Sequence, residues 1–579
     1  MGRIHNLLAC GIALFAAMPA TVQGQYANGY LMSRYRSYNE EMPLLSSTNN
    51  GFGTARSIAM GGAYTSLGAD LSSIGINPAG LGMYQSSEFG ITGNLGISQY
   101  SNSSPMLTSG KGDNKTSFAL NNVGLALNFY EGLGDVTSFT FGFSYNRIAD
   151  YNYKNSLTTD FDHLSLGEVF ALQLWGIPSE WMKRNSNPSP WNNLDIRIEE
   201  WGAALGYMTG LVGAFAEPED PNWKDRPSDL GFDNKFEELR NRTYYIRGVN
   251  LWGNDNRTAL VKHNLRTESK GGAGEYNIAG GFNLRGNVYL GFSLGLQDIY
   301  RKQTVMYSET YMNNGGANDP ADRMSYSQHT RVSGSGFNFK IGAIANPVGG
   351  LRIGLAFHSP TWNTINKRYF ANMQTATSAM VYAQGTDTYE FEYKYSSFGR
   401  LLTGLSYTFG TKAILSVDYE CDFYNWMRIR VPDSERYYTI DGEYHDEFEE
   451  LKESVKDTYK PRHVIRVGGE YKITPAFAVR AGFAYHGSFL QNEDDIFNEP
   501  LPYKTMNISG GLGYRFSNRI SLDLAYVFMK TDYTRYELFY YDGPNNYVDG
   551  RTIIDYGIDN AIKSNLKNHN IVMSFNVRF

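Results

Sequence analysis

The 579-residue sequence has little cysteine, no surplus of positive charge and no long apolar run after its first residues. One of its two cysteines, Cys10, lies in the N-terminal leader, so Cys421 is the single thiol beyond it and no internal disulfide forms. A net charge of −6 without a Lys/Arg-rich run argues against nucleic acid as a partner. Beyond the leader no run of 18 or more apolar residues occurs, which excludes transmembrane helices.

Residues 1–24 have the pattern of a cleaved export signal. A short charged head containing Arg3 precedes an apolar core from Leu7 to Ala17, and the segment ends on a small residue. Acylation at Cys10, as in a lipoprotein, is the less favoured alternative because the apolar core follows that cysteine instead of preceding it. We therefore expect an exported protein.

Aromatic residues are abundant, although the average polarity is that of a soluble protein. Tyr (43) and Phe (33) bring the aromatic content to 15%, Gly reaches 61, and the mean hydropathy is −0.40. A membrane β-barrel combines these features because lipid-facing apolar residues alternate with polar lumen residues and aromatic girdles mark both interfaces.

The clearest pattern is an alternation with period two, which is that of a β-strand. At the C-terminus Phe579, Val577 and Phe575 share an apolar face, while Arg578 and Asn576 lie on the other. Fourteen segments of this kind are predicted, at 87–98, 116–130, 137–149, 275–285, 288–302, 330–346, 350–360, 398–409, 412–430, 461–473, 476–488, 504–516, 519–533 and 567–579. The predicted fold class is all-β, a transmembrane antiparallel barrel of about 14 strands.

Short and long connections alternate between these segments. The short ones are 131–136, 285–287, 346–350, 410–411, 474–475 and 517–518. The long ones are 99–115, 150–274, 303–329, 361–397, 431–460, 489–503 and 534–566. This alternation is expected when one rim has periplasmic turns and the other has surface loops, and it indicates the outer membrane of a Gram-negative bacterium. A soluble β-sandwich is the alternative, because soluble strands also alternate.

The longest loop, 150–274, contains two helix-like stretches, 164–182 and 201–216. We expect them to pack on each other or over the barrel mouth. Our hypothesis is that they form an exposed apolar groove that captures a hydrophobic ligand. The alternative is that they form a small core of the loop itself. The candidate groove residues are Trp201, Leu205, Tyr207, Met208, Leu211, Val212 and Phe215, with Phe170, Leu174 and Trp175.

Between the leader and the first strand the chain does not alternate. Residues 54–64 read TARSIAMGGAY, and Asn77, Pro78, Ala79 and Gly80 follow shortly before the first strand. This pattern resembles the N-terminal hatch of the FadL/TodX family, the outer-membrane transporters of long-chain fatty acids and aromatic hydrocarbons. The paired Gly-bearing segments at 340–361, which end in Ser-Pro, are also similar to a hairpin of that family.

The resemblance implies a fourteen-strand barrel for passive uptake of hydrophobic small molecules. It divides the chain into residues 25–86, an N-terminal extension with the hatch inside the lumen, and 87–579, the barrel. In that family the Asn-Pro-Ala signature seats the hatch, which would assign this role to Asn77, Pro78, Ala79 and Gly80. A kink in the third strand, around Gly142, would open a lateral exit. The terminal Phe579, with Val577 and Phe575, is similar to the signal read by the barrel-assembly machinery.

Arg466 and Arg480 fall on the predicted lumen face of one hairpin, nearly opposite each other, where they could bind a ligand carboxylate. The alternative is pairing with lumen acids such as Asp418, Glu420, Glu470 or Asp523. Inward glycines would leave room for the hatch and a ligand, or would only ease barrel curvature. These glycines are Gly404, Gly468, Gly482, Gly511 and Gly513.

Enzymatic activity has little support in the sequence. Residues 291–295 match G-x-S-x-G, but they lie within an alternating strand instead of the strand-to-helix turn that this motif requires. The nine histidines show no metal-site spacing, so we expect no metal and no cofactor. The expected partners are a hydrophobic ligand, outer-membrane lipids and the barrel-assembly machinery, with the barrel as a monomer. Alternative functions are a protein-secretion or surface-attachment scaffold, a haem receptor, or an outer-membrane lipase.

Overall fold

A computed structural model gives the placement of the chain from residue 53 onward. It describes residues 53–579 except 104–106, 110, 132–133, 160–164, 175–178, 184–185, 187–188, 193–199, 215–243, 247–258, 314–322, 377–380, 431–435, 439–443, 447–454, 492–503, 538–546, 549–550 and 553–560. The expected export signal, 1–24, and residues 25–52 of the expected N-terminal extension with hatch lie outside the described residues.

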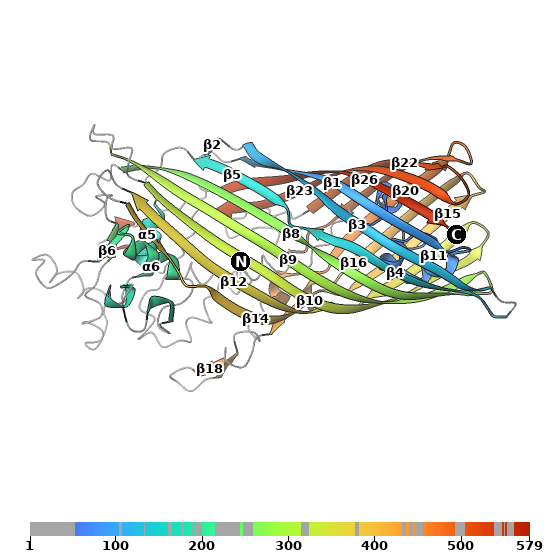
Figure 1. Ribbon diagram of the computed structural model, residues 1–579, viewed down its shortest axis with the longest axis horizontal. Coiled ribbons are helices and arrows are strands. Elements are labelled where there is room, and N and C mark those ends of the chain that lie inside the picture. Colours follow the sequence, from blue (N-terminus) through green and yellow to red (C-terminus); the bar gives the residue numbers. More distant parts are fainter. Residues whose placement is uncertain are drawn as a thin grey trace, which may run out of the picture.

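The strands form one antiparallel sheet that closes on itself, because β1 pairs with both β26 and β3 (Figure 1). Fourteen strands complete the circle, which confirms the predicted fold class and strand number. In order around the barrel they are β1 (Glu88–Ser103), β3 (Lys111–Glu131), β4 (Val136–Asp150), β8 (Ala259–Leu284), β9 (Val288–Asn313), β10 (Arg323–Val348), β11 (Leu351–His358), β15 (Arg400–Phe409), β16 (Ala413–Asp422), β20 (Arg462–Lys472), β21 (Phe477–His486), β22 (Lys504–Arg515), β23 (Ile520–Glu537) and β26 (Ala561–Arg578).

Six further strands extend the wall at the long-loop rim: β2 (Leu107–Ser109), β5 (Tyr153–Thr159), β12 (Trp362–Ala376), β13 (Val381–Gly385), β14 (Tyr389–Ser396) and β17 (Arg428–Arg430). Three separate two-stranded ribbons are β6 (Val212–Ala214) with β7 (Tyr244–Ile246), β18 (Arg436–Tyr438) with β19 (Tyr444–Asp446), and β24 (Tyr547–Val548) with β25 (Arg551–Thr552). The long connection expected at 361–397 is therefore largely strand, and the strand expected at 412–430 is interrupted between β16 and β17.

The helices of the described residues are short, and they include α3 (Ala55–Ala59), α4 (Ser73–Ile76), η1 (Pro78–Met83), α5 (Leu166–Gln173), η2 (Ser179–Met182), η3 (Pro190–Asn192), α6 (Trp201–Met208) and η7 (Tyr424–Trp426). Residues 455–458 form a further helical turn. Within the described part of the chain, no helix has both the length and the hydrophobicity needed to cross a bilayer.

The period-two pattern separates the two faces of the wall. On β26 Phe575 is 40% exposed and points outward, while the neighbouring Ser574 is fully buried in the lumen. Large apolar side chains are exposed in the same way on strands all around the barrel, among them Leu290, Leu405 and Ile508. Because burying apolar surface in lipid is favourable, this belt is the surface that lies in the outer membrane.

Tight turns join the strands at the rim where the chain ends. The turn from β8 to β9 uses Arg285 and Gly286, both with positive φ (52° and 75°). The last strand ends at the same rim, where Arg578 pairs with Glu88 at the start of β1. Figure 1 shows the C-terminus at this end and α5 and α6, which belong to the longest connection, at the other, so the short-turn rim faces the periplasm.

The longest strands extend well beyond the apolar belt. β8, β9 and β10 have 26 residues each, whereas about 9–11 tilted residues cross a membrane. On β10 the outward residues Phe337 and Phe339 are apolar, but further out Ser325 and Ser327 face outward while Met324 and Tyr326 are buried inside. The apolar face therefore changes sides along the strand. This change is the reason that the sequence predicted strands shorter than the structure has.

Candidate functional site

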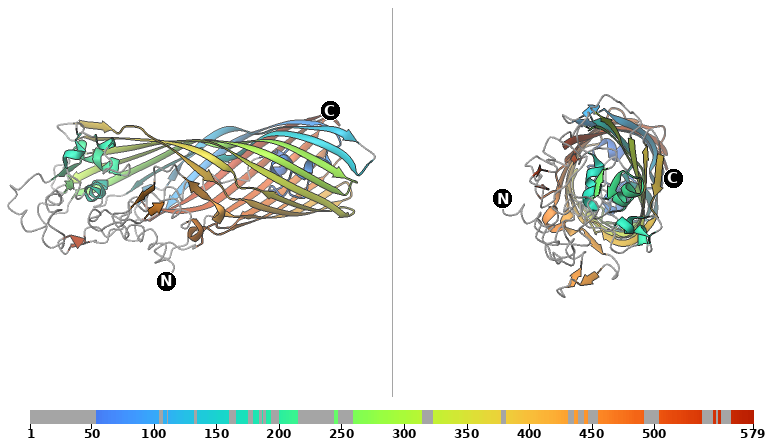
Figure 2. Two further views of the ribbon diagram at one scale, coloured as in Figure 1. Left: turned by 90° about the horizontal axis from the view of Figure 1, so that it is seen from below. Right: turned by 90° about the vertical axis from the view of Figure 1, so that its left-hand side faces the viewer.

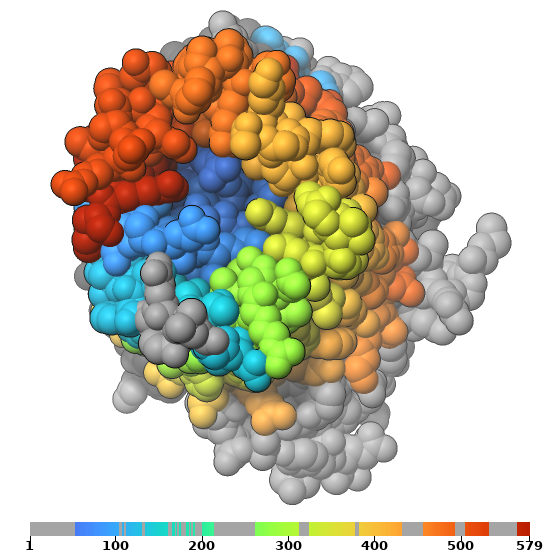
Figure 3. All heavy atoms as spheres, turned by 90° about the vertical axis from the view of Figure 1, so that its right-hand side faces the viewer, coloured from blue at the N-terminus to red at the C-terminus, as the bar shows by residue number. Residues whose placement is uncertain are grey.

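Residues 53–84 lie inside the barrel, at the level of the apolar belt. We call them the lumenal segment. Seen from the short-turn rim, they occupy the interior of the ring of strands (Figure 3). Their apolar side chains, including Met60, Leu71 and Ile74, are fully buried. The chain thus enters its own lumen before it forms the first strand.

The lumenal segment is held in shape by side chains that cap its short helices. Thr54 caps α3 by accepting a hydrogen bond from the backbone N–H of Ser57 (3.3 Å), and its hydroxyl donates to Asp70 (2.7 Å). Asn77 caps η1: its Oδ1 accepts from the N–H of Ala79 (3.1 Å), while its Nδ2 donates to the carbonyl of Thr65 (2.7 Å). Proline is favoured after such a cap because the first turn of a helix needs no N–H there. The residues singled out in the Asn-Pro-Ala signature therefore fix one turn of this segment.

A belt of inward-facing glycines lets the backbone of the lumenal segment approach the wall. A Cβ added at Gly468 would lie 2.2 Å from the carbonyl oxygen of Met60, and one at Gly482 would lie 2.1 Å from the nitrogen of Gly61. Such distances leave no room for any side chain. The glycines in close contact with the segment are Gly90, Gly124, Gly142, Gly281, Gly291, Gly342, Gly354, Gly404, Gly468, Gly482 and Gly511. Four of the five predicted glycines thus make room for the segment, whereas Gly513 lies beside Arg480 and Asp523.

Ion pairs and hydrogen bonds fasten the lumenal segment to the wall. Arg56 Nε donates to the carboxylate of Glu470 on β20 at 2.9 Å. The backbone N–H of Thr65 donates to Asp418 at 2.7 Å, and that of Ala55 to Ser574 at 2.7 Å. His358 Nε2 donates to the carbonyl of Ile76 at 2.8 Å. These contacts come from β11, β16, β20 and β26, so the segment is attached on more than one side.

The structure places Arg466 and Arg480 in ion pairs with buried acids. Arg480 bonds Glu470 and Asp523, each at 2.7 Å, and Arg466 bonds Glu420 at 2.7 Å. We predicted that the two arginines lie nearly opposite each other, and this prediction was wrong. Arg480 instead opposes Glu470, because the turn between the two strands is centred nearer to Thr474-Pro475. Their charges are already balanced, which favours the alternative of pairing with lumen acids over binding of a ligand carboxylate.

A layer of buried charged side chains lies in the lumen outward of the lumenal segment. Arg462 bonds Asp422 at 2.6 Å, and Lys340 bonds Glu275 on β8. Asn338 also donates to Glu275, at 2.8 Å. Each of these carboxylates therefore has a cation beside it.

Outward of this layer, aromatic side chains fill the middle of the lumen. The rings of Phe398 and Tyr424 stack at 4.1 Å, those of Tyr424 and Phe489 at 4.7 Å, and Arg462 lies 5.0 Å from the Tyr424 ring. We call the buried group the aromatic compartment: Tyr151, Ile299, Val332, Ile365, Tyr393, Tyr395, Phe398, Tyr424, Met427, Ile429, Val455, Tyr459 and Phe489. The sequence analysis did not identify it. The available signal was the run Phe423, Tyr424 and Trp426, which does not alternate as the surrounding strand does.

The helices α5 and α6 lie inside the outer mouth of the barrel, as the end-on view shows (Figure 2, right). We call them the mouth cap. Trp201 and Phe170 contact Tyr389 and Tyr326 of the wall edge-on, at 6.0 and 5.7 Å between ring centroids. The carboxylate of Glu309, fully buried on β9, accepts hydrogen bonds at the start of α5 from the N–H of Leu166 (2.6 Å) and the hydroxyl of Ser165 (2.7 Å).

The predicted groove residues come together, but they form a core and not an exposed surface. Six of them, Trp201, Leu205, Leu211, Val212, Phe170 and Leu174, are buried in one cluster with wall residues such as Met324 and Met373. Tyr207 packs against that cluster, and Met208 is half-buried. Trp175 and Phe215 lie outside the described residues. The prediction of an exposed apolar patch was therefore wrong, because these side chains find a better apolar partner in the inner wall of the extended barrel.

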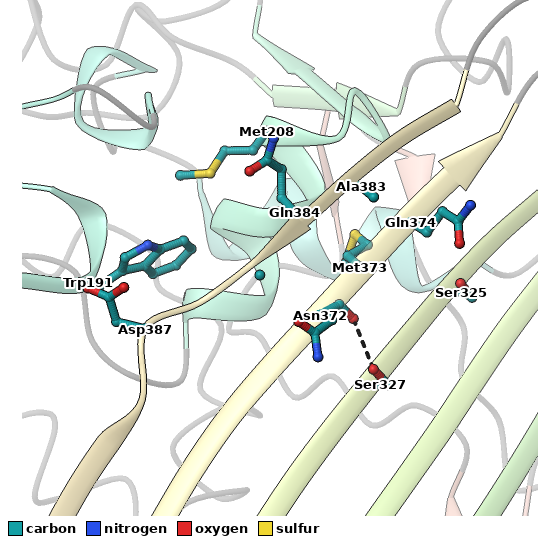
Figure 4. A pocket seen from close by; sticks show the side chains of 11 residues that line it. Trp191, Met208, Ser325, Ser327, Asn372, Met373, Gln374, Ala383, Gln384 and Asp387 are labelled. Carbon is teal, nitrogen blue, oxygen red and sulfur yellow. Dashed lines mark hydrogen bonds between the residues drawn. The ribbon is translucent and has the colours of Figure 1, made fainter.

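A cleft of about 540 Å³ opens beside the mouth cap (Figure 4). Met208 comes from α6 of the mouth cap and Trp191 from η3, and the remaining lining residues come from β10, β12, β13 and the turn after β13. They are Ser325, Ser327, Asn372, Met373, Gln374, Ala383, Gln384, Gly385 and Asp387. Met208 is thus the predicted groove residue that reaches an open site, and this site has both apolar and polar walls.

Around Gly142 the wall is continuous. β4 pairs with β3 through Ala126 and with β8 through Ala279, and its register shifts lie at residues 136–138 and 147–149. The lateral opening expected at Gly142 is not present in this structure. Gly142 belongs instead to the glycine belt, since an added Cβ would lie 2.8 Å from the side chain of Leu81.

Two of the predictions concern a serine-hydrolase motif and a metal site, neither of which we expected. Residues 291–295 lie in the middle of β9, where the buried Ser293 faces Asn277 at 3.4 Å, so the G-x-S-x-G match has no strand-to-helix turn. Over the described ranges, no group of three or more His, Cys, Asp or Glu residues is arranged to hold a metal ion.

A closed barrel with a lipid-facing apolar belt and a segment of its own chain inside defines an outer-membrane β-barrel of a Gram-negative bacterium. The resemblance to the FadL/TodX family is confirmed by the family model described as "Outer membrane protein transport protein (OMPP1/FadL/TodX)", which matches residues 273–538. A search of curated proteins gave no match.

Solved structures of similar barrels include the toluene transporter TodX of P. putida, at 11% identity and a TM-score of 0.45, covering 92% of this chain and 99% of TodX. A FadL homologue of Pseudomonas aeruginosa has 13% identity and a TM-score of 0.47, with 92% and 98% covered. The monoaromatic hydrocarbon channel CymD has 10% identity and a TM-score of 0.45, with 92% and 99% covered.

Proposed function

We propose that the protein is a channel for passive uptake of hydrophobic small molecules, such as long-chain fatty acids or aromatic hydrocarbons, across the outer membrane. The family match supports transport as the general function. In this proposal residues 25–86 include the hatch, 87–579 form the barrel, and the loop 150–274 supplies the mouth cap. Asn77, Pro78, Ala79 and Gly80 seat the hatch. Phe575, Val577 and Phe579 are the assembly signal, and two of them, Phe575 and Phe579, are exposed to the bilayer side.

The observation that carries the proposal is the apolar character of the outer lumen. Water-filled barrels have polar interiors. Here the mouth cap and the aromatic compartment place Leu205, Tyr393, Phe398 and Tyr424 inside the barrel. A hydrophobic solute gains free energy on leaving water for such surroundings, about 25 cal/mol per Å² of apolar area buried, whereas a hydrophilic solute loses its hydration there.

The cleft beside Met208 is the proposed point of first capture, because it joins open solvent to the buried cap. From there the solute would pass along Trp201 and Leu205 into the aromatic compartment. Further passage requires the charged layer and the lumenal segment to give way. Since all these steps follow a concentration gradient, the proposal needs no energy source.

The test is uptake by cells that lack an uptake route of their own and express the full chain. We expect faster uptake of a labelled long-chain fatty acid or alkylbenzene, with no added leak of a small hydrophilic sugar. Phe398→Asp should abolish the gain because it places a charge in the aromatic compartment. Val381→Asp, at an exposed position on β13, is the matched control and should leave uptake unchanged. Unaltered hydrophobic uptake on expression of the wild-type chain, or leakage of the sugar at the same rate, would contradict the proposal.

A further inference from the structure

Four neighbouring strands carry a cation at the same level of the outer wall. Lys270 on β8 opposes Lys302 on β9, Lys302 opposes Arg331 on β10, and Arg331 opposes Arg368 on β12. All four side chains are exposed on the outside of the barrel, and Figure 1 shows the four strands side by side. We call this set the cationic row. With about 4.8 Å between strands, it is about 14 Å long.

Among the described residues of the wall, acidic partners are found only for the cations at the two ends of the row. Lys270 lies 3.4 Å from Glu268, and Arg368 is paired with Glu390. In the part of the chain that the structure describes, the central Lys302 and Arg331 form no ion pair, and the Arg331 guanidinium lies 5.3 Å from the centroid of the Tyr300 ring. The nearest acid on the same face of β9 is Asp298, four residues from Lys302.

Such an arrangement costs stability in the isolated barrel. Like charges on directly opposite residues of neighbouring strands repel each other, because their Cβ atoms are only about 4.5–5.5 Å apart. Since Glu268 and Glu390 lie beside the cations at the two ends, the repulsion between Lys302 and Arg331 is the one that an external anion would offset. An anion that presents several negative charges along a line would contact all four cations at once, whereas a single small ion would reach only one pair.

The height of the row limits what that anion can be. Lys302 lies six residues beyond Leu296, and Arg331 six residues beyond Phe337, on the long-loop side of the belt. At the tilt of barrel strands this is about 14 Å along the membrane normal, above the hydrocarbon layer. We propose that the cationic row binds the phosphate groups of the phosphorylated glycolipid that forms the outer leaflet, and so fixes a lipid molecule against β8–β12.

The test uses the full-length barrel in an uncharged maltoside detergent, titrated with phosphorylated lipopolysaccharide. Lys302→Gln with Arg331→Gln should weaken binding about thirtyfold, because each cation near an anionic headgroup layer contributes about a factor of five. Lys302→Gln alone should weaken it about fivefold, and it serves if the double variant does not fold. The matched control is Arg515→Gln with Arg519→Gln, two exposed cations at the short-turn rim, which should bind within twofold of the wild type.

Thermal unfolding separates this binding from a structural role. Without glycolipid the double variant should unfold at the same temperature as the wild type or higher, because a repulsion has been removed. With glycolipid the wild type should be the more stable of the two. Enzymatically dephosphorylated lipopolysaccharide should protect neither. Equal binding by the double variant and the control, equal binding of the dephosphorylated lipid, or equal protection by inorganic phosphate alone would each overturn the proposal.

Discussion

The guanidinium of Arg56, in the lumenal segment, lies 2.9 Å from the carboxylate of Glu470 on the barrel wall, and Glu470 also bonds Arg480 of the next strand at 2.7 Å. One acid thus joins the segment inside the lumen to a hairpin of the wall. Because Arg480 is shared between Glu470 and Asp523, Arg56 supplies the second positive charge of this buried cluster.

Arg56→Gln should loosen the lumenal segment and leave the barrel intact. A charged hydrogen bond of this kind contributes about 2 kcal/mol. We expect larger and more frequent openings in single-channel recordings, together with greater sensitivity of cells to a large hydrophilic antibiotic. Arg285→Gln removes an exposed pair with Asp135 and should change neither quantity. Recordings of Arg56→Gln that match the wild type would show that the segment is held by other contacts.

The glycine belt predicts different effects for two adjacent residues. Gly468→Ala places a methyl group 2.2 Å from the carbonyl oxygen of Met60, so the lumenal segment must move, at a cost of about 1–3 kcal/mol. Gly469→Ala meets only the carbonyl oxygen of Ile414, at 3.7 Å, and should be neutral or slightly stabilising. Limited proteolysis of residues 53–84 in the folded barrel measures the difference. Similar cleavage of both variants would contradict close packing at Gly468.

At Asn77 the aspartate variant should be worse than the alanine variant. Asn77→Ala loses a helix cap, which costs about 1 kcal/mol. Asn77→Asp keeps the acceptor for the Ala79 N–H, but it places a carboxylate oxygen 2.7 Å from the carbonyl oxygen of Thr65, where Nδ2 now donates. The order of unfolding temperatures, wild type above Ala above Asp, checks this. If Asp were the milder change, the donor role assigned to Nδ2 would be incorrect.

Glu309→Gln should free the start of α5. The carboxylate accepts from Ser165, Leu166, Tyr307 and Tyr311, and an amide offers one oxygen in place of two. We expect amide hydrogen exchange in residues 165–173 to rise at least tenfold, with exchange in β22 unchanged. Glu392→Gln, on the outward face of β14, is the control. Unchanged exchange in α5 would mean that apolar packing alone holds the mouth cap.

The barrel could be predicted from the sequence because its lipid-facing alternation is a one-dimensional pattern, as on β26 with Phe575 outward and Ser574 inward. The full height of the strands could not be predicted from the sequence. On β10 the apolar positions move from the outer face at Phe337 to the inner face at Tyr326, and a search for lipid-facing residues stops there. A search for outward-facing apolar residues near the membrane and for inward-facing apolar residues beyond it would have predicted the correct length of the strand.

The candidate site was predictable only in part. The contact of Gly468 and Gly482 with the lumenal segment follows from their inward phase and from the family resemblance. The burial of Leu205 did not follow, because an apolar helix has the same sequence whether it faces solvent or the inside of a wall. The pairing of Arg480 with Glu470 depends on the register of one hairpin, which a shift of one residue in the turn changes.

The 26-residue strands β8, β9 and β10 are about 60 Å long along the membrane normal, twice the thickness of the hydrocarbon layer. Because the hydrocarbon layer takes up only half of that height, the remainder projects beyond the bilayer on the long-loop side. Ser325, which lines the cleft beside Met208, lies 12 residues beyond Phe337 of the apolar belt, about 28 Å along the membrane normal, so the cleft is reached from the water outside the cell and not from within the bilayer.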